Sequence, residues 1–269
     1  MIHRDPYARL ASVYDLMAGD PGIQAFYYEW VDSLLAAIDR HGVRVRTLVD
    51  VACGTGNSTL PWLKQHGWTV VGVDRSEAML REARRKSKRV RWHCQELTAL
   101  RLPYRADVVT CHFDALNHVL DARGLRRVFA SVAGLLEDGG LFQFDVNTPA
   151  ALEWLGRHEK FFRVGPHCFS AFNEYDRARR IATFHQMWFV KRGRLFERRE
   201  VIVQERGYPR ATLRRMLVAA GFRVESVTTQ RKVDGKPSRL LVVARKRPAH
   251  SRPGAPTPPR VAPNGGRPA

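Results

Sequence analysis

Apolar and polar positions change their spacing from one segment of this chain to the next. Between Pro21 and His41 apolar residues recur every three or four positions, so we expect an amphipathic helix there. From Val45 onward, short runs rich in β-branched residues alternate with helical stretches. The five runs are Thr47 to Val51, Thr69 to Val73, Val90 to Cys94, Asp107 to Cys111 and Leu141 to Val146. Strands separated by helices need right-handed crossovers, so the pattern predicts an α/β fold with a doubly wound parallel sheet.

After Asn147 the alternation of strand and helix gives way to three strands rich in aromatic residues. They cover Cys168 to Tyr175, Ile181 to Lys191 and Arg194 to Glu205, and their short connectors predict hairpins. Helical spacing resumes from Pro209 to Ala220. Two last strands, Arg223 to Thr229 and Ser238 to Ala244, then flank the turn Asp234-Gly235. We expect a Rossmann-like sheet of about seven strands with the last one antiparallel, plus an antiparallel β insertion.

The same patterns divide the chain into parts. Residues 1–44 are expected to form N-terminal lid helices. Residues 45–247 form the main domain, and residues 150–208 within it are the antiparallel insertion. The remaining segment, residues 248–269, has seven prolines and almost no large apolar side chain. Such a segment cannot offset the entropy lost on ordering, so we expect a disordered tail.

A formal net charge of +19 introduces nucleic acid as an alternative partner. Most of the excess is arginine scattered along the chain, and the densest cluster, from Arg84 to Arg89, ends a predicted helix, where the helix dipole favours cations. Nucleic-acid proteins usually gather charge on one face with aromatic residues between, so scattered charge favours a solvated surface. The chain shows neither a membrane-spanning run nor a secretory signal, and its four separated cysteines suit reduced thiols. We therefore expect a cytoplasmic protein.

Two glycines follow the first predicted strand. Asp50 lies inside that buried strand, while Gly54 and Gly56 occupy the turn to the next segment, where backbone without a Cβ can approach a ligand. A dinucleotide-binding turn would have a third glycine where this chain has Thr59, and Asp50 suits a cationic ligand better than a phosphate. The second strand ends at Asp74, whose carboxylate can accept hydrogen bonds from both hydroxyls of a ribose.

With these residues the chain, from about Ala11 to Arg247, resembles the class I S-adenosylmethionine-dependent methyltransferases, in particular the small-molecule type with a β insertion after the fifth strand. The resemblance implies a methyltransferase domain over residues 45–247 and S-adenosylmethionine as the cofactor. It places Asp50, Ala52, Gly54 and Gly56 around the methionyl part, Asp74 at the ribose, and Glu96-Leu97 at the adenine, although aspartate is the family's usual acid there. Tyr14 is expected at the carboxylate end of the cofactor, with Tyr28 as a second candidate. Further expected cofactor contacts are Cys53, Arg75, Met79 and His112.

The acceptor is expected where the fourth strand ends, because parallel sheets bind ligands beyond the carboxyl ends of their strands. His112 and His118 follow that strand, and His185 lies in the insertion. Each is a candidate general base, since imidazole titrates near neutrality. The alternative is an enzyme without a base, because methyl transfer from a sulfonium to an aligned neutral nucleophile needs little acid–base help. Asp145 and Asn147 are expected to face the acceptor. His185 or Glu174 would reach into its pocket, and no metal is implied.

The resemblance therefore implies an enzyme that transfers a methyl group to a nitrogen or oxygen of a small-molecule acceptor, and the type it resembles acts on amino sugars and other small metabolites. A monomer or a homodimer is expected. Three alternatives stay open: an RNA methyltransferase, a protein that binds S-adenosylmethionine without catalysis, and a Rossmann dehydrogenase. The missing third glycine disfavours the dehydrogenase.

Overall fold

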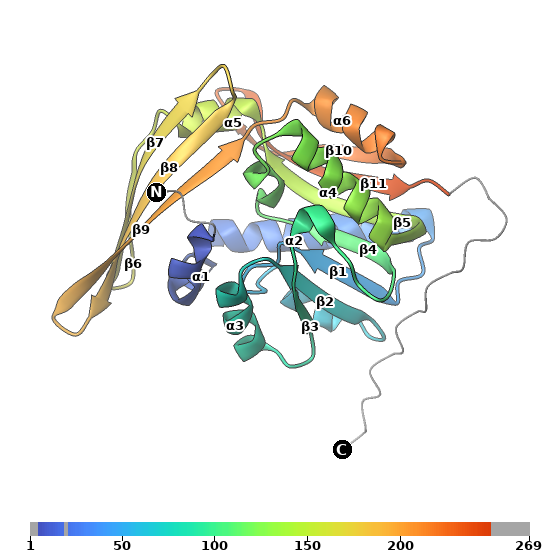
Figure 1. Ribbon diagram of the computed structural model, residues 1–269, viewed down its shortest axis with the longest axis horizontal. Coiled ribbons are helices and arrows are strands. Elements are labelled where there is room, and N and C mark those ends of the chain that lie inside the picture. Colours follow the sequence, from blue (N-terminus) through green and yellow to red (C-terminus); the bar gives the residue numbers. More distant parts are fainter. Residues whose placement is uncertain (1–4, 19–20, 249–269) are drawn as a thin grey trace.

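The computed structural model describes residues 5–18 and 21–248, which form two β-sheets flanked by helices (Figure 1). The larger sheet has seven strands in the order β10-β11-β5-β4-β1-β2-β3. Its strands are β1 (Thr47–Val51), β2 (Thr69–Asp74), β3 (Arg91–Cys94), β4 (Ala106–Cys111), β5 (Leu136–Asn147), β10 (Phe222–Val233) and β11 (Lys236–Lys246). The five predicted strands and the closing hairpin are all present, so the predicted Rossmann-like fold class is confirmed.

The direction of the strands follows the sequence pattern. From β5 across to β3 neighbouring strands run parallel. Strand β11 then pairs antiparallel with β5, and β10 pairs antiparallel with β11 around the turn at Asp234. Because the parallel strands end at one edge of the sheet, their connecting turns gather there and can form a single site.

Helices cover both faces of the larger sheet (Figure 1). Helix α2 (Pro21–His41) lies on one face, and α4 (Ala122–Leu135) and α6 (Arg210–Ala219) lie on the other. Alternate residues of β1 show the division, since Leu48 packs with Leu34 of α2 whereas Val49 packs with Val128 of α4. The predicted helix from Pro21 to His41 is confirmed. Next to β2, α3 (Glu77–Lys86) begins at the N-cap Ser76, whose hydroxyl accepts from the backbone N–H of Met79.

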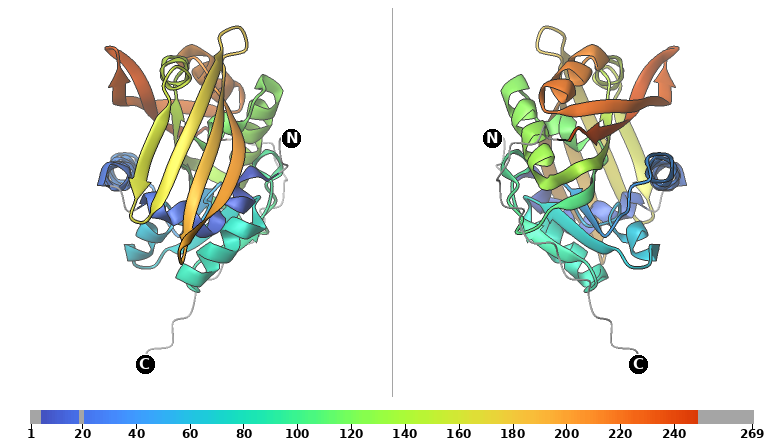
Figure 2. Two further views of the ribbon diagram at one scale, coloured as in Figure 1. Left: turned by 90° about the vertical axis from the view of Figure 1, so that its left-hand side faces the viewer. Right: turned by 90° about the vertical axis from the view of Figure 1, so that its right-hand side faces the viewer.

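The smaller sheet is the predicted antiparallel insertion, seen face-on in the left view of Figure 2. It contains β6 (Lys160–Val164), β7 (His167–Asp176), β8 (Ile181–Arg192) and β9 (Leu195–Arg206). The sequence predicted β7 to β9 but not β6. That strand gives no clear alternation of buried and exposed residues, because Lys160 is exposed and Phe161 is 72% exposed.

One face of the smaller sheet packs on the N-terminal elements η1 (Pro6–Arg9) and α1 (Ala11–Ala18), and on α5 (Pro149–Leu155). Phe184 and Trp188 of β8 share a hydrophobic cluster with Leu10, Val13 and Leu152. The insertion and the N-terminal elements therefore form one packed unit, which lies to the left of the larger sheet in Figure 1.

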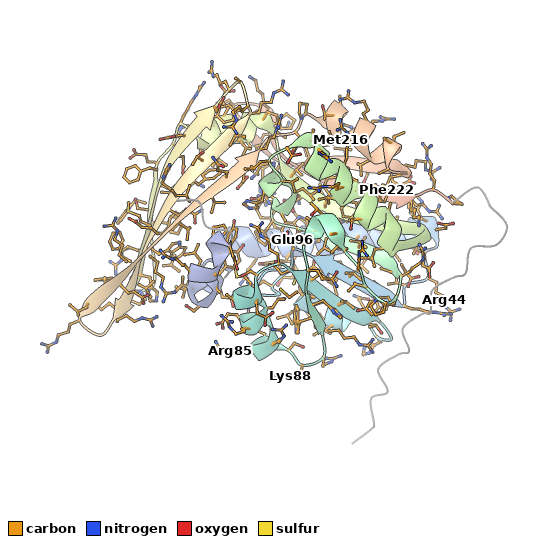
Figure 3. The ribbon with its side chains drawn as sticks, viewed as in Figure 1. Arg44, Arg85, Lys88, Glu96, Met216 and Phe222 are labelled. Carbon is orange, nitrogen blue, oxygen red and sulfur yellow. The ribbon has the colours of Figure 1, made fainter. Side chains whose placement is uncertain are left out.

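Charged side chains spread over the surface of the molecule. Arg44 projects at one end of the view in Figure 3, while Arg85 and Lys88 project near α3. None of the helices in the described ranges is both long and apolar enough to cross a membrane. The predicted tail, residues 248–269, lies outside the described residues apart from Pro248.

Candidate active site

A cavity of about 300 Å³ lies at the carboxyl ends of β1, β2 and β4. Most of the expected cofactor residues line it, namely Tyr14, Ala52, Gly54, Asp74, Arg75, Met79, Glu96, Leu97 and His112. Asp50, Cys53 and Gly56 are not part of this lining. Residues of η1 and of the first turns of α4 complete the wall, among them Asp5, Tyr7, Asp121 and Arg127.

The turn after β1 contains three residues in the left-handed backbone region, Ala52 (φ 55°), Gly54 (φ 55°) and Gly56 (φ 84°). Their surroundings differ. A Cβ added at Gly54 would meet no protein atom within 4 Å, whereas one added at Gly56 would lie 2.6 Å from the ring of Trp92. Gly54 therefore keeps the cavity open to a ligand, while Gly56 makes room for packing behind it.

Asp74 joins the end of β2 to the glycine turn. Its Oδ2 accepts from the backbone N–H of Gly54 at 2.8 Å, and its Oδ1 accepts from the backbone N–H of Ser76 at 2.8 Å. Burial raises the pKa of Asp74, although both backbone bonds oppose the rise. Each carboxylate oxygen has a second lone-pair site, so Asp74 can still accept from a ligand in the cavity.

Asp50 is fully buried and is not among the residues that line the cavity. Its Oδ2 accepts from the hydroxyls of Ser58 (2.8 Å) and Thr59 (2.6 Å), and its Oδ1 accepts from the hydroxyl of Thr110 on β4 (2.8 Å). Burial raises the pKa of Asp50 to about 6, while the three hydroxyl bonds oppose the rise. Asp50 thus ties the glycine turn to β1 and β4, and no contact with a ligand is needed to explain it.

The N-terminal helix α1 is fastened over the glycine turn. The carboxylate of Asp15 accepts from the hydroxyl of Thr55 (2.6 Å) and from the Asn57 side chain (2.8 Å), and it pairs with Lys86 of α3. Tyr14, the neighbour of Asp15, lines the cavity, and burial raises the pKa of its hydroxyl. Asp15 therefore places Tyr14 against the ligand space.

His112 directly follows β4 and is 3% exposed. Its ring stacks on Trp30 of α2, with 4.4 Å between ring centroids and 1° between planes, and its Nε2 lies 3.0 Å from the Gln143 side chain. Burial lowers the pKa of His112 to about 3. The imidazole is therefore neutral at working pH and is a weak base, which argues against the predicted role in proton removal.

His118 lies in the 3₁₀ turn η4 (Ala115–His118), and both of its ring nitrogens have partners. A carbonyl can only accept, so Nδ1–H donates to the Gln204 carbonyl at 3.1 Å, and Nε2 accepts from the Tyr7 hydroxyl at 3.0 Å. Burial lowers the pKa of His118, although the nearby charge of Asp114 opposes this. Tyr7 and His118 both line the cavity, so this pair connects the ligand space to the insertion.

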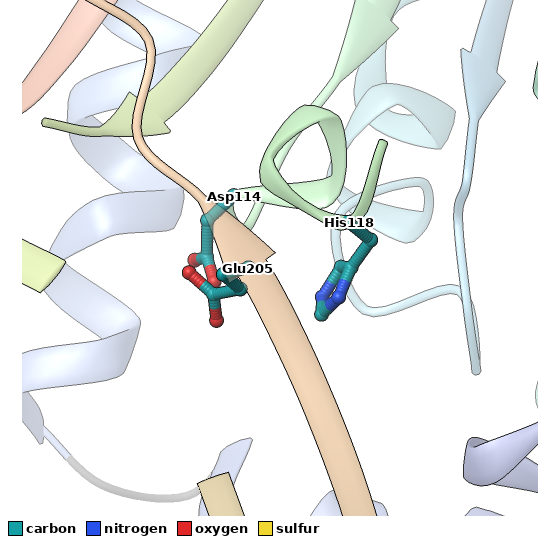
Figure 4. Close-up of side chains that lie close together, drawn as sticks. All are labelled: Asp114, His118 and Glu205. Atoms are coloured by element: carbon teal, nitrogen blue, oxygen red, sulfur yellow. The ribbon is translucent and has the colours of Figure 1, made fainter. Parts of the chain in front are cut away.

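A pair of carboxyl groups, Asp114 and Glu205, lies next to His118 (Figure 4). Burial and the charge of Asp114 raise the pKa of Glu205 well above its usual range. For Asp114 burial would also raise the pKa, but the charge of Arg239 and the hydrogen bond from Glu205 lower it overall. Glu205 therefore keeps its proton and donates a hydrogen bond to the Asp114 carboxylate.

Asp114, His118 and Glu205 offer ligand atoms within 4.8 Å of one another, which is close enough for a metal ion. Protein groups already use these atoms, however. Arg239 pairs with Asp114, the Asn147 side chain donates to Glu205 at 3.0 Å, and both nitrogens of His118 are engaged. The cluster is thus accounted for by hydrogen bonds within the fold.

Arg239 of β11 is the centre of this polar network. Its guanidinium pairs with Asp114 and with the fully buried Asp145 of β5 at 2.6 Å, and the strained Asp114 backbone (φ 48°) donates to Asp145. Burial raises the pKa of Asp145 to about 6, and the charge of Arg239 opposes the rise. Asp145 and Asn147 were expected to face the acceptor, but neither lines the cavity.

Three sequence expectations are corrected by the direction of side chains. On β8 the residues Phe184 and Trp188 face the core, so His185 points to the opposite face and does not line the cavity. Glu174 of β7 is likewise exposed on the side away from that core. Tyr28 of α2 is 67% exposed and does not line the cavity either.

Sequence reasoning missed Tyr7, Glu205 and Arg239. Tyr7 and Glu205 carry no local signal, because only the packing of η1 and β9 brings them to the cavity end of β4. Arg239 could have been found, since Asp145 occupies the middle of a strongly apolar strand and a buried carboxylate needs a cationic partner.

Over most of its length the chain is similar to known proteins. The family described as a methyltransferase domain matches residues 48–140. The chain is 27% identical over 250 residues to a protein of Geobacillus sp. (strain WCH70) named as a methyltransferase, covering 89% of this chain and 99% of that one. Over 115 residues it is 33% identical to dTDP-3-amino-3,6-dideoxy-alpha-D-glucopyranose N,N-dimethyltransferase of Streptomyces fradiae, covering 43% and 44% of the two chains.

The fold is also found in a solved structure, that of an S-adenosylmethionine-dependent methyltransferase from Clostridium acetobutylicum ATCC 824. The TM-score is 0.77 at 24% identity, covering 90% of this chain and 99% of that one. The matched domain contains the glycine turn, Asp74 and the end of β4, which line much of the cavity described above. Residues 48–140 thus match a methyltransferase domain, and most of the chain is similar to proteins of the class I S-adenosylmethionine-dependent methyltransferase type.

Proposed function

We propose that the protein transfers the methyl group of S-adenosylmethionine to a nitrogen or oxygen of a small-molecule acceptor. The observation that carries this proposal is the position of Asp74, which is bonded to the N–H of Gly54 and lines the cavity at the carboxyl edge of the sheet. A carboxylate at this place suits the two hydroxyls of a ribose.

The cavity lining suggests how the cofactor lies. Glu96 and Leu97 would hold the adenine, Asp74 the ribose, and Gly54 and Tyr14 the methionyl part. The methyl group would then face the end of β4 and the Tyr7–His118 pair. Because η1 and β9 contribute to that end, the N-terminal segment and the insertion would together enclose the acceptor.

The reaction is one displacement. A lone pair of the acceptor nitrogen or oxygen forms a bond to the methyl carbon while the carbon–sulfur bond breaks, and S-adenosylhomocysteine leaves. His118 is the remaining imidazole candidate for taking the acceptor's proton, through the Tyr7 hydroxyl. A neutral amine can instead release its proton to water after transfer, so alignment would supply most of the rate enhancement.

A nitrogen acceptor is favoured by one comparison. The Streptomyces fradiae relative is named for dimethylation of an amino sugar nucleotide, and its similarity covers part of this chain only. We therefore place small amines, amino sugars among them, first in a search for the acceptor, followed by hydroxyl compounds.

The first experiment is a calorimetric titration of the protein with S-adenosylhomocysteine, with NAD and a mixed RNA as parallel ligands. We expect binding of S-adenosylhomocysteine in the micromolar range or tighter and none of NAD. Asp74→Ala should weaken this binding on the order of a hundredfold, because two hydrogen bonds to a charged acceptor are lost.

Glu77→Ala provides a matched control, since this α3 carboxylate pairs with Arg84 on the surface and does not line the cavity. It should leave the affinity unchanged. Equal affinities of wild type and Asp74→Ala would contradict the ribose assignment, and a preference for NAD would contradict the cofactor. Transfer of a labelled methyl group to an amine library then separates an enzyme from a protein that only binds the cofactor.

A further inference from the structure

The ring of His112 is held in a single orientation. One face stacks on Trp30 at 4.4 Å, and Phe113, the next residue, stands edge-on to the same indole with 4.8 Å between ring centroids. The residue is 3% exposed and lines the cavity. Stacking of this kind leaves each ring nitrogen one fixed direction in which to hydrogen-bond.

The side chain of Gln143 on β5 determines which nitrogen of His112 carries the proton. Both ends of the Gln143 amide find partners in one orientation, with its Nε2 donating to the Trp30 carbonyl (3.1 Å) and its Oε1 accepting from the Leu34 N–H (3.3 Å). In that orientation the amide Nε2 also donates to Nε2 of His112 at 3.0 Å. The lone pair of His112 Nε2 is then in use, so the neutral ring carries its proton on Nδ1.

The Nδ1 atom of His112 is buried and has no hydrogen-bond partner among the described residues. A buried N–H without a partner is costly, and such atoms are rare in native proteins. Because the residue lines the cavity, a ligand in the cavity is the natural source of the missing acceptor.

We propose that His112 is a hydrogen-bond donor to the cofactor, with Nδ1–H bonded to a carboxylate oxygen of the methionyl part. This inference rests on the proposed function, which places the methionyl part beside Gly54 and Tyr14. The methionyl part has an ammonium group, which can only donate, and a carboxylate, which can only accept. A donor N–H can therefore pair only with the carboxylate.

The same geometry removes His112 from the candidate bases. Its one lone pair faces Gln143, so it could take a proton from the acceptor only by breaking that hydrogen bond. His112 would act by binding and orienting the cofactor.

The test compares the binding of two ligands to wild type and to one variant that keeps an aromatic ring at position 112. S-adenosylhomocysteine has the carboxylate, and its decarboxylated thioether, 5′-deoxy-5′-(3-aminopropylthio)adenosine, lacks it. His112→Phe keeps a ring for stacking on Trp30 and removes the donor. We expect this variant to bind S-adenosylhomocysteine about tenfold more weakly than wild type does, and to bind the decarboxylated compound within about twofold of wild type.

Equal losses for both ligands, or no loss for either, would overturn the contact. If wild type bound neither compound, the proposed function would fail and this contact with it. A measurement on unliganded wild type needs no variant: long-range proton–nitrogen NMR of ¹⁵N-histidine-labelled protein should give the Nδ1–H pattern for His112. The opposite pattern, with the proton on Nε2, would overturn the proposal even if His112→Phe does not fold.

Discussion

At the scale of single residues, Asp50 shows how a buried charge supports the site without touching a ligand. Its carboxylate is surrounded by the hydroxyls of Ser58, Thr59 and Thr110. These bonds do not fully replace water, and burial raises the pKa of Asp50 to about 6. The folded state therefore binds a proton at this group more readily than the unfolded state, whose aspartates titrate near 3.9.

A carboxylate with a raised pKa in the folded state favours folding when it is protonated, so its contribution is greatest below about pH 4 and is lost as the pH rises through about 6. On going from pH 7 to pH 5, Asp50 should add about 1 kcal/mol to the free energy of unfolding.

Asp50→Asn should remove this increment. Urea unfolding of wild type and variant at pH 5 and pH 7 measures it, because other groups that titrate in this range, including Asp145, are present in both proteins. The difference between the two proteins should therefore change with pH by about 1 kcal/mol. A difference that is the same at both pH values would mean that Asp50 titrates normally.

Site residues with a local sequence signal, such as a position at a strand end or in a turn, could be predicted from the sequence. Those that reach the site only through packing were missed. Asp74 ends a strand and Gly54 occupies a turn, so both could be placed from their positions in the chain, and both line the cavity. The partner of Asp50 on β4, Thr110, is 60 residues away, and no local pattern indicates it. His185 was placed in an acceptor pocket because the sequence could not tell which face of the insertion packs on the core.

At the scale of elements, the attachment of α1 is the feature most directly linked to binding. Asp15 holds the helix through Thr55, Asn57 and Lys86, and its neighbour Tyr14 lines the cavity. All three partners belong to the glycine turn or to α3. The Asp15 carboxylate therefore joins α1 directly to the turn that is expected to bind the cofactor.

Asp15→Ala should loosen α1 without unfolding the main sheet. Losing these partly exposed contacts should cost about 1 kcal/mol, which corresponds to roughly fivefold faster amide exchange over residues 11–18 and a similar loss of S-adenosylhomocysteine affinity. Glu82→Ala is the control, because among the described residues that α3 carboxylate forms an ion pair with Arg85 alone. If both variants exchange like wild type, Asp15 does not fasten the helix.

The elements themselves were largely readable from the sequence. Strand β1 begins and ends where the β-branched run does, and α2 spans its predicted range, because each has one strongly apolar pattern. β5 begins earlier than predicted. Its first residues, Leu136 to Gly140, include charged residues and glycines, which do not indicate a strand, yet Leu136 pairs with Ala106 of β4. Such pairing depends on the neighbouring strand, which a local pattern does not contain.

At the scale of the whole molecule, the high positive net charge is a property that the proposed function does not explain. The formal net charge is +19, yet Arg44, Arg85 and Lys88 project from separate places (Figure 3), and acidic partners such as Glu77, Glu82 and Glu197 pair with several arginines. Diffuse positive charge attracts nucleic acid weakly and does not fix its position on the protein. An RNA methyltransferase would also have to hold one base in the cavity, and scattered charge does not do this.

The charge and the catalytic site should therefore be separable. Residues 249–269 contain three arginines and no acidic residue, so removing them lowers the formal net charge from +19 to +16. The described lining of the cavity lies between Asp5 and Arg127, and we expect the truncated protein to bind S-adenosylhomocysteine with unchanged affinity while its binding to mixed RNA weakens.

For both proteins, RNA binding should fall steeply as salt is raised from 50 to 200 mM, whereas cofactor binding should change little. A methyl-transfer assay with labelled cofactor decides between the two acceptor classes. We expect label to enter small amines and not RNA, and excess RNA to leave the transfer rate unchanged at the higher salt. Label incorporated into RNA, and lost on truncation, would show instead that the charge guides the acceptor to the site.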